Sequence, residues 1–215
     1  DEAEKSIKRL RVPFLDGYLL HDASGIYNLK ILDGLKELKE SGKVKHIGVS
    51  IYEEKDALHA ASLGSIDYIQ IPYNIFDQRL TKTDFFTLTK KNHVKVFARS
   101  AFLQGLLLMD IDKIPPHLAE AKKYIEQLDA IIKDCGITRQ QAALLFSYFN
   151  DGIDYVVIGV DTSKQLAQHI ETVQKISQPK YKTCIQKLLG SFLYEDINRN
   201  IISPNLWENL KSGKI

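Results

Sequence analysis

Polar residues that could do chemistry recur directly after apolar runs of this chain. His21 follows the run 14–20, and Ser50 ends the run 44–50. The same arrangement returns with Gln70 and Asn74, Arg99 and Ser100, and Asp161 and Thr162. An imidazole can exchange a proton near neutral pH, while hydroxyl and amide groups both donate and accept hydrogen bonds. The repetition indicates a site built from several segments, although ordinary loop polarity explains any one of these residues.

These residues are positioned by a predicted alternation of strands and helices. Short apolar runs predict strands at 17–21, 44–50, 67–72, 94–100 and 154–159. Helical spacing predicts helices at 29–38, 56–63, 83–92 and 163–176, with two more inside 116–150. Such an alternation favours a parallel sheet covered by helices, in which the carboxyl ends of the strands share one face. The polar residues above would meet at that face.

The two ends of the chain do not follow this alternation. Residues 1–10 read as the end of a helix, with no strand before it. The tail 178–215 has no strand pattern, and we expect Phe192 and Trp207 to anchor it to the rest of the fold.

Composition excludes several classes of function. The chain has 215 residues, enough for one domain, with 44% hydrophobic and 26% charged residues. A net charge of +2 gives no broad attraction to nucleic acid or anionic membrane, and no apolar run is long enough to span a bilayer. Cys135 and Cys184 are expected to be buried thiols rather than a disulfide. We expect a cytoplasmic protein without a metal site.

Five segments of the chain resemble the aldo-keto reductases in order and spacing. They are Asp16 to His21, Leu35 to Ser50, Ile69 to Asn74, Ala98 to Leu107, and Ile158 to Leu166. Each segment alone is a weak signal, but together they cover nearly the whole chain. The amino-acid sequence of residues 73–80 and 102–109 is similar to that of a bacterial subgroup of the family that is linked to sugar and surface-polysaccharide metabolism.

The resemblance implies an α/β fold, the (β/α)8 TIM barrel. This chain would supply roughly strands 4–8 and the C-terminal helices, as a single incomplete domain over residues 1–215. It also implies reduction of an aldehyde or ketone, a sugar among the candidates, with NADP or NAD as cofactor. The carbonyl oxygen gains negative charge as it accepts hydride, so a proton donor must lie beside it.

The family's active site uses Asp, Tyr, Lys and His, and only the histidine has a match here. His21 matches it and would orient the substrate oxygen and assist proton transfer. The other three belong to strands that would precede residue 17, so about 90 residues of three βα units are not in the sequence. Taken without the resemblance, His21 reads more readily as a histidine that caps a strand end by hydrogen bonding.

The cofactor-binding residues implied by the resemblance are better represented. Ser50 and Gln70 match residues that hydrogen-bond the nicotinamide carboxamide. Arg99 replaces an aromatic residue that often stacks on the nicotinamide, and a guanidinium can also stack or form a salt bridge. The remaining matches are the pyrophosphate loop Ser100, Ala101, Phe102 and Gln104, and the adenosine end Gly159, Asp161, Gln165, Gln168 and His169.

Other positions depart from the family pattern. Ile51 stands where Asn often follows the serine, which removes one carboxamide contact, and Gln168 with His169 replaces a frequent Glu-Asn pair. Asp161 stands where Ser or a basic residue commonly meets the 2′-phosphate of NADP. A carboxylate repels that phosphate but can accept a hydrogen bond from a free ribose hydroxyl, so we expect NAD to compete well with NADP.

Three functional readings therefore stay open. The first is an aldo-keto reductase, and the second is a non-catalytic relative that binds nucleotide or acts as a regulatory subunit. The third is a different TIM-barrel enzyme. A sheet of five strands leaves two open edges, at 17–21 and 154–159. We expect the chain alone to be unstable or to pair with a second copy. No nucleic-acid or membrane partner is expected.

Overall fold

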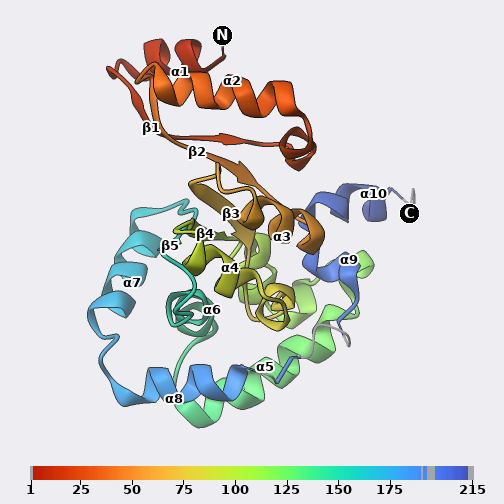
Figure 1. The fold of residues 1–215 in the computed structure, drawn as a ribbon. Helices are drawn as coiled ribbons and strands as arrows, with labels where there is room; N and C mark the ends of the chain where they lie inside the picture. Colours follow the sequence, from red (N-terminus) through yellow and green to blue (C-terminus); the bar gives the residue numbers. More distant parts are fainter. Residues whose placement is uncertain (1, 190, 193–196, 213–215) are drawn as a thin grey trace. The chain divides into compact units, whose positions relative to one another are not determined.

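The computed structural model describes residues 2–189, 191–192 and 197–212. Five strands form one sheet in the order β1-β2-β3-β4-β5, and the pairs β1–β2 and β2–β3 are parallel. The strands are β1 Leu15–Leu20, β2 Val44–Ser50, β3 Tyr68–Pro72, β4 Lys95–Arg99 and β5 Tyr155–Val156. The helices are α1 Glu2–Leu10, α2 Leu29–Glu40, α3 Glu54–Ser62, α4 Phe85–Lys91, α5 Ala121–Cys135, α6 Arg139–Tyr148, α7 Ser163–Gln174, α8 Pro179–Leu188, α9 Arg199–Ile202 and α10 Trp207–Lys211. Figure 1 shows these elements.

The chain divides into two compact units. Unit 1 comprises Asp1–Pro72, Arg79–Ala98 and Gly152–Tyr155, and unit 2 comprises Tyr73–Gln78, Arg99–Asp151 and Val156–Ile215. The single incomplete domain expected from the sequence stays a prediction. No helix in the described part of the chain is long and apolar enough to cross a membrane.

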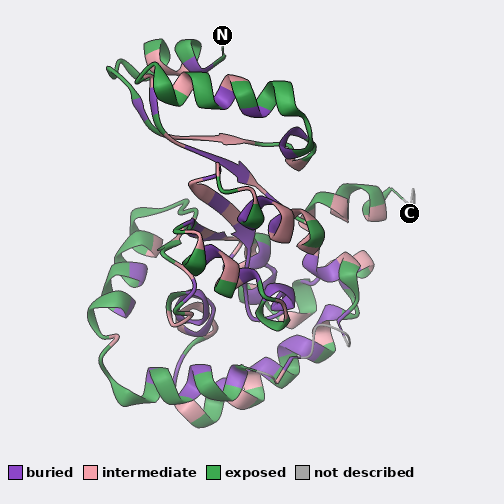
Figure 2. Cartoon of the chain, viewed as in Figure 1, coloured by how far each residue is buried: buried purple, intermediate pink, exposed green. Residues whose placement is uncertain are grey.

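Unit 1 is built on the sheet. Leu15, Leu35, Val44 and Ile47 form a buried cluster to which α1 contributes Ile7, so α1 and α2 cover the same face of β1 and β2 (Figure 1). On α3, three alanines spaced along one helix face are fully buried. Small residues there let the helix approach the sheet closely, and Figure 2 shows the buried residues continuing along the strands.

The amino ends of two strands are fixed by the same device. The Asp67 carboxylate, just before β3, accepts a hydrogen bond from the Ile47 N–H at 2.9 Å. The Asp154 carboxylate, just before β5, accepts one from the Val96 N–H at 2.9 Å and pairs with Lys95 at 2.6 Å. A side chain thus adds one hydrogen bond to the ladder where β3 begins beside β2 and another where β5 begins beside β4, which holds the register of each pair.

Unit 2 is a helical assembly around α6. Residues Ala142 to Ser147 of α6 are buried without interruption, so this helix is enclosed on all sides rather than amphipathic. It packs against α5, α7 and α8 and against the 3-10 helix Leu103–Leu108. From the tail, Phe192 is buried against Phe76, as expected, with ring centroids 5.1 Å apart. Trp207 is half-buried and donates from Nε1 to the Asn200 carbonyl at 2.9 Å.

Two expectations from the sequence were wrong. The predicted strand 154–159 is only the two residues of β5, and Val157 and Val160 are each 42% exposed. An apolar run cannot by itself tell a strand from an exposed connection, and no neighbouring strand on that side among the described residues gives 157–159 a pairing partner. Cys135 is half-exposed and only Cys184 is buried, because Cys135 ends α5; both are free thiols.

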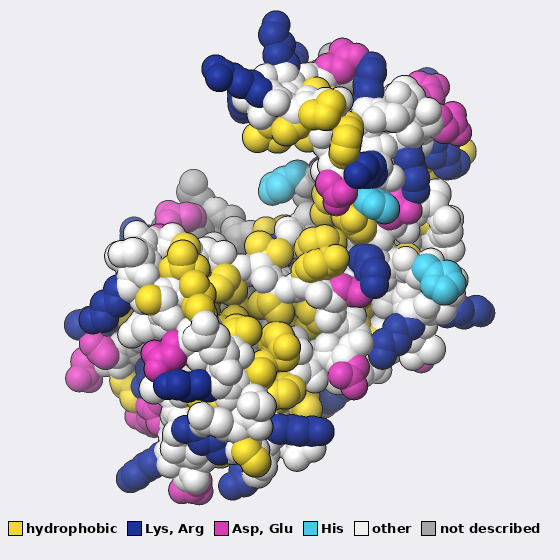
Figure 3. Space-filling model, turned by 90° about the vertical axis from the view of Figure 1, so that its left-hand side faces the viewer, with side chains coloured by type: hydrophobic (Ala, Val, Ile, Leu, Met, Phe, Trp, Pro, Cys, Tyr) yellow, Lys and Arg dark blue, Asp and Glu magenta, His cyan; other side chains and the backbone are white. Residues whose placement is uncertain are grey.

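Part of unit 2 presents apolar side chains to solvent. Leu166, Ile170 and Val173 of α7 are between 41% and 49% exposed, and they continue the exposed stretch that begins at Val157. Figure 3 shows hydrophobic side chains gathered on the side of the molecule that carries β5 and α7. Since β5 is an end strand of the described sheet, the open edge expected at this position is present.

We predict that Gly48→Ala destabilises the protein. An added Cβ would lie 2.3 Å from the Tyr68 carbonyl oxygen and 2.9 Å from the Tyr68 Cβ, and a neighbouring strand cannot yield by that much. Overpacking of this kind costs about 1–3 kcal/mol of unfolding free energy. Urea unfolding followed by circular dichroism measures the loss.

Gly34→Ala is the matched control, because nothing lies within 4 Å of a Cβ at that position inside α2. It should leave the midpoint unchanged or raise the unfolding free energy by up to about 1 kcal/mol. Equal stability of Gly48→Ala and the unmodified protein would contradict the close β2–β3 packing described above.

Candidate functional site: a nucleotide-sized cavity in unit 2

The loop after β4 has an unusual backbone. Ser100, Leu103 and Gln104 have φ of 62°, 48° and 51°, and Gly105 has φ of 89°. Non-glycine residues seldom adopt positive φ, and each such residue costs free energy that the surroundings must offset. Here the Ser100 carbonyl accepts from the Leu103 N–H at 2.9 Å and from Asn74 Nδ2 at 3.2 Å. The side chains of Leu103 and Leu106 are buried and anchor the loop.

Two helices begin at the same cavity as this loop. At α6, Thr138 and Gln141 form a reciprocal capping box, and at α7 Thr162 and Gln165 form another. Each box satisfies the N-cap and third-residue N–H groups and leaves those of the first two helical residues without an acceptor among the described residues. The two helix starts therefore offer N–H donors and the positive ends of two helix dipoles.

A buried histidine joins the two helices. His169 of α7 is 6% exposed, and its Nδ1 lies 2.6 Å from Gln140 Nε2 of α6. Gln140 Oε1 in turn accepts from the Thr172 hydroxyl at 3.3 Å. The Phe102 ring stacks on His169 with centroids 5.1 Å apart. Burial lowers the pKa of His169, so the ring is neutral, and its Nδ1 accepts a hydrogen bond from the Gln140 amide while the ring stacks on Phe102.

Among the described residues, Arg139 is the one cation that lines the cavity, and it is already paired. Arg139 makes a bidentate pair with Asp129, with Nε–Oδ1 and Nη2–Oδ2 distances of 2.5 Å, and its Nη1 donates to the Met109 carbonyl at 2.6 Å. The neighbouring carboxylate raises the pKa of the guanidinium. Arg139 thus ties the end of the 100–109 loop to α5 and α6 and adds little net charge to the cavity.

The cavity between these elements has a volume of about 710 Å³ and lies wholly within unit 2. From the residues proposed on sequence grounds, it is lined by Ser100, Ala101, Phe102, Gln104, Gly159, Asp161, Gln165, Gln168 and His169. Gln165 is occupied by its capping role, because its Oε1 accepts from the N–H groups of Asp161 at 2.7 Å and Thr162 at 3.2 Å. The loop that begins at Ser100 and the segment from Gly159 to Asp161, which are distant in sequence, thus meet at one cavity.

Arg99 is not among the lining residues. Its Nη1 donates to the Ser100 hydroxyl at 3.2 Å, so it contacts the loop rather than the cavity. Sequence reasoning missed the contribution of α6, from which Thr138, Arg139 and Gln140 line the cavity, and the neighbouring Gly105, Leu108, Val157 and Ile158. The start of α6 could have been recognised from the spacing Thr138-x-x-Gln141, which is typical of a capping box.

The remaining candidates lie in unit 1 at the carboxyl ends of neighbouring strands. Ser50 pairs with Gln70 in the β2–β3 register, and the Gln70 carbonyl accepts from the Ile51 N–H at 2.8 Å. Leu20 pairs with Val49, so the next residue, His21, is at the level of Ser50. His21 is exposed, while Ser50 and Gln70 are half-buried. The sheet therefore brings these three residues to one edge.

Comparison with known proteins settles the family. A sequence model of the aldo/keto reductase family matches residues 1–188. The chain belongs to the aldo/keto reductase family. It is 29% identical over 110 residues to aldo-keto reductase YhdN of Bacillus subtilis, covering 50% of this chain and 32% of that protein. It is 28% identical over 153 residues to the NADH-specific methylglyoxal reductase of Escherichia coli, covering 69% and 47%. The chain thus spans about a third to a half of these relatives.

Solved structures agree on the fold. The aldo-keto reductase AKR11C1 from Bacillus halodurans, in its apo form, superposes with a TM-score of 0.69 at 20% identity, over 87% of this chain and 66% of that one. The glycerol dehydrogenase AKR11B4 from Gluconobacter oxydans gives 0.65 at 20% identity, over 92% and 65%. The strands and helices described here are therefore part of the (β/α)8 barrel fold, as expected from the sequence.

We predict that the buried His169 makes stability depend on pH. Its folded pKa is lowered, so between that value and the unfolded value of about 6.5 only the unfolded chain binds the proton. Stability is complete above about pH 6.5 and falls as the pH decreases toward the folded pKa. Unfolding free energies measured across this range should show that slope.

His169→Gln should lose the part of the slope that His169 contributes, while substitution of an exposed histidine, His93→Gln, should keep it. Proton NMR titration gives the pKa directly. A His169 that titrates at or above about 6.5 would contradict the buried, neutral ring.

Proposed function

We propose that this protein is an NAD(P)-dependent aldo-keto reductase that reduces an aldehyde or ketone, with the dinucleotide held by unit 2. The observation that carries the proposal is the cavity at the starts of α6 and α7. Its lining combines N–H donors at two helix termini, a strained loop and aromatic rings. These are the groups that a pyrophosphate and a purine ring require.

The residues present fit the adenosine and pyrophosphate half of such a cofactor. The volume of about 710 Å³ lies within the range of small-molecule and cofactor sites. The N–H groups at the starts of α6 and α7 would take the pyrophosphate oxygens, and the exposed Asp161 carboxylate would accept from ribose hydroxyls. Phe102, held by His169, offers an aromatic surface at the loop.

For the nicotinamide, the family resemblance implicates Ser50 and Gln70, which lie in unit 1. The bound nicotinamide would supply or accept the hydride. Ser50 and Gln70, paired across β2 and β3, would hydrogen-bond its carboxamide through a hydroxyl and a side-chain amide. His21 would orient the carbonyl oxygen of the substrate and assist proton transfer there. Turnover also requires the Asp, Tyr and Lys that the family resemblance assigns to strands preceding residue 17.

Cofactor choice is proposed to favour NAD over NADP. The 2′-phosphate of NADP needs a cation, and Arg139, the one cation of the lining within the residues that the structure describes, is bound to Asp129. Asp161 adds a negative charge to the lining. Both features weaken binding of the additional phosphate. Among the relatives, the Escherichia coli protein is described as NADH-specific and the Schizosaccharomyces pombe protein yakc as using NADP(+), so both cofactors occur in related proteins.

Isothermal titration with NADH and NADPH tests the nucleotide proposal. NADH should bind more tightly than NADPH. Asp161→Ser should strengthen NADPH binding about fivefold, because removing one charge about 4 Å from a phosphate in water is worth about 1 kcal/mol. NADH affinity should fall slightly as the ribose acceptor is lost.

Asp151→Ser is the matched control, since Asp151 is an exposed carboxylate of unit 2 outside the cavity lining. It should change neither affinity. Failure of both nucleotides to bind at millimolar concentration would contradict the proposal. Binding with no carbonyl reduction, in a protein that also carries the Asp, Tyr and Lys, would favour the non-catalytic nucleotide-binding alternative.

A further inference from the structure

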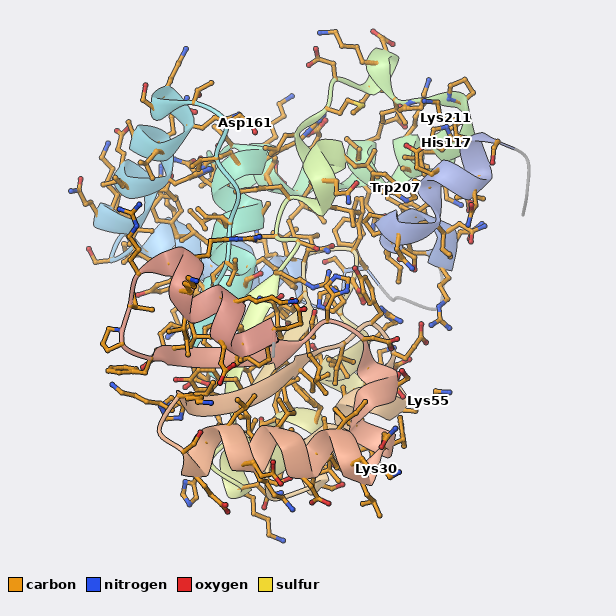
Figure 4. The ribbon with its side chains drawn as sticks, turned by 90° about the horizontal axis from the view of Figure 1, so that it is seen from above. Lys30, Lys55, His117, Asp161, Trp207 and Lys211 are labelled. Atoms are coloured by element: carbon orange, nitrogen blue, oxygen red, sulfur yellow. The ribbon has the colours of Figure 1, made fainter. Side chains whose placement is uncertain are left out.

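Unit 2 contains a second cavity, of about 700 Å³, beside the nucleotide-sized one. It lies between the Pro115–His117 segment and the C-terminal part of the chain from Pro204 to Lys211. The short 3-10 helix Pro116–Leu118 packs against α10. Gln104, at the tip of the strained loop, lines both cavities. Figure 4 shows His117, Trp207 and Lys211 together on one side of unit 2, with Asp161 at another.

Rigid side chains form part of the wall of this second cavity. Pro115, Pro116 and Pro204 line it with rings that have little conformational freedom to lose. Trp207 lines it as well, and the bond from its Nε1 to the Asn200 carbonyl fixes the indole. A half-buried indole whose polar atom is already satisfied presents its apolar surface to a ligand.

The polar groups of the cavity are varied rather than of one charge. The Lys211 ammonium donates hydrogen bonds and the Glu208 carboxylate accepts them. The side-chain amides of Gln104 and Asn205 can do either. His117 can donate or accept. No hydrogen bond or ion pair of the Lys211 ammonium or the Glu208 carboxylate is found within the described ranges of the chain. Both groups are therefore available to a ligand.

We propose that this second cavity binds a sugar ring. One face of a pyranose is apolar and packs on an aromatic or proline surface, while its hydroxyls require donors and acceptors together. A pocket for a simple anion would concentrate cations, whereas this one places a carboxylate beside its lysine. The strained Gln104 would contact both the sugar and the neighbouring ligand. This sugar site is independent of the proposed function, in which the substrate carbonyl is assigned to His21 of unit 1.

Trp207 is the only tryptophan of the chain, so its fluorescence reports on this cavity alone. Titration with glucose and with glucuronate, without cofactor, should give saturable changes with dissociation constants in the millimolar range. Glycerol, which has hydroxyls but no ring face, should give none. Glucuronate should bind more tightly than glucose, because Lys211 can pair with its carboxylate.

Lys211→Gln should weaken glucuronate binding about threefold to fivefold, the effect of one exposed ion pair. Lys55→Gln, an exposed lysine of unit 1, should leave it unchanged. In saturation-transfer NMR, Trp207→Ala should lose the signal of both sugars, while Tyr148→Ala, an exposed aromatic residue of unit 2, should retain it. Circular dichroism confirms that each variant is folded.

Absence of a saturable change with either sugar would overturn the proposal, as would equal effects of the two lysine substitutions. Binding of NADH is measured separately by the fluorescence of the nucleotide. A protein that binds NADH and no sugar refutes only the sugar site, and one that binds sugar and no NADH refutes only the nucleotide proposal.

Discussion

The arrangement of unit 2 depends on how α6 and α7 begin. Both helices start with a threonine whose side chain caps the third N–H, answered by a glutamine that caps the threonine's own N–H. The boxes fix where each helix starts and leave two N–H donors per helix facing outward. The Gln140–His169–Thr172 contacts then tie the two helices together just inside those starts. The helix geometry thus provides N–H donors that an anion could use, and within the described part of the chain no unpaired Lys or Arg lines the cavity.

The loop after β4 completes this site at a cost in backbone strain. The positive φ angles of Ser100, Leu103 and Gln104 are stabilised by leucine side chains buried beside the loop. They are also stabilised by the hydrogen bond that the Asn74 amide donates to the Ser100 carbonyl. Arg139 holds the far end of the loop through the Met109 carbonyl while Asp129 neutralises its charge. The result is a cavity that is rich in N–H donors and in which Asp161 adds a negative charge, a combination poorly suited to an additional phosphate.

Much of the fold could be predicted from the sequence, because the strand and helix periods alternate regularly and leucines mark the helix faces. The strand predicted at 154–159 was too long, since an apolar run looks the same whether or not a neighbouring strand pairs with it. The cavity residues on the loop and α7 were inferred from family resemblance. Those on α6 were missed, because Thr138 to Gln140 become cavity residues only through the packing of α6 against α7 and the loop.

Hydrogen–deuterium exchange with and without NADH tests most directly whether unit 2 holds the dinucleotide at the two helix starts. Bound nucleotide should slow exchange of the N–H groups at 100–105, 138–140 and 161–165, and leave the amino end of the sheet near Asp67 and Asp154 unchanged. Slowed exchange elsewhere, or no change at saturating NADH, would contradict the assignment of the nucleotide to this cavity.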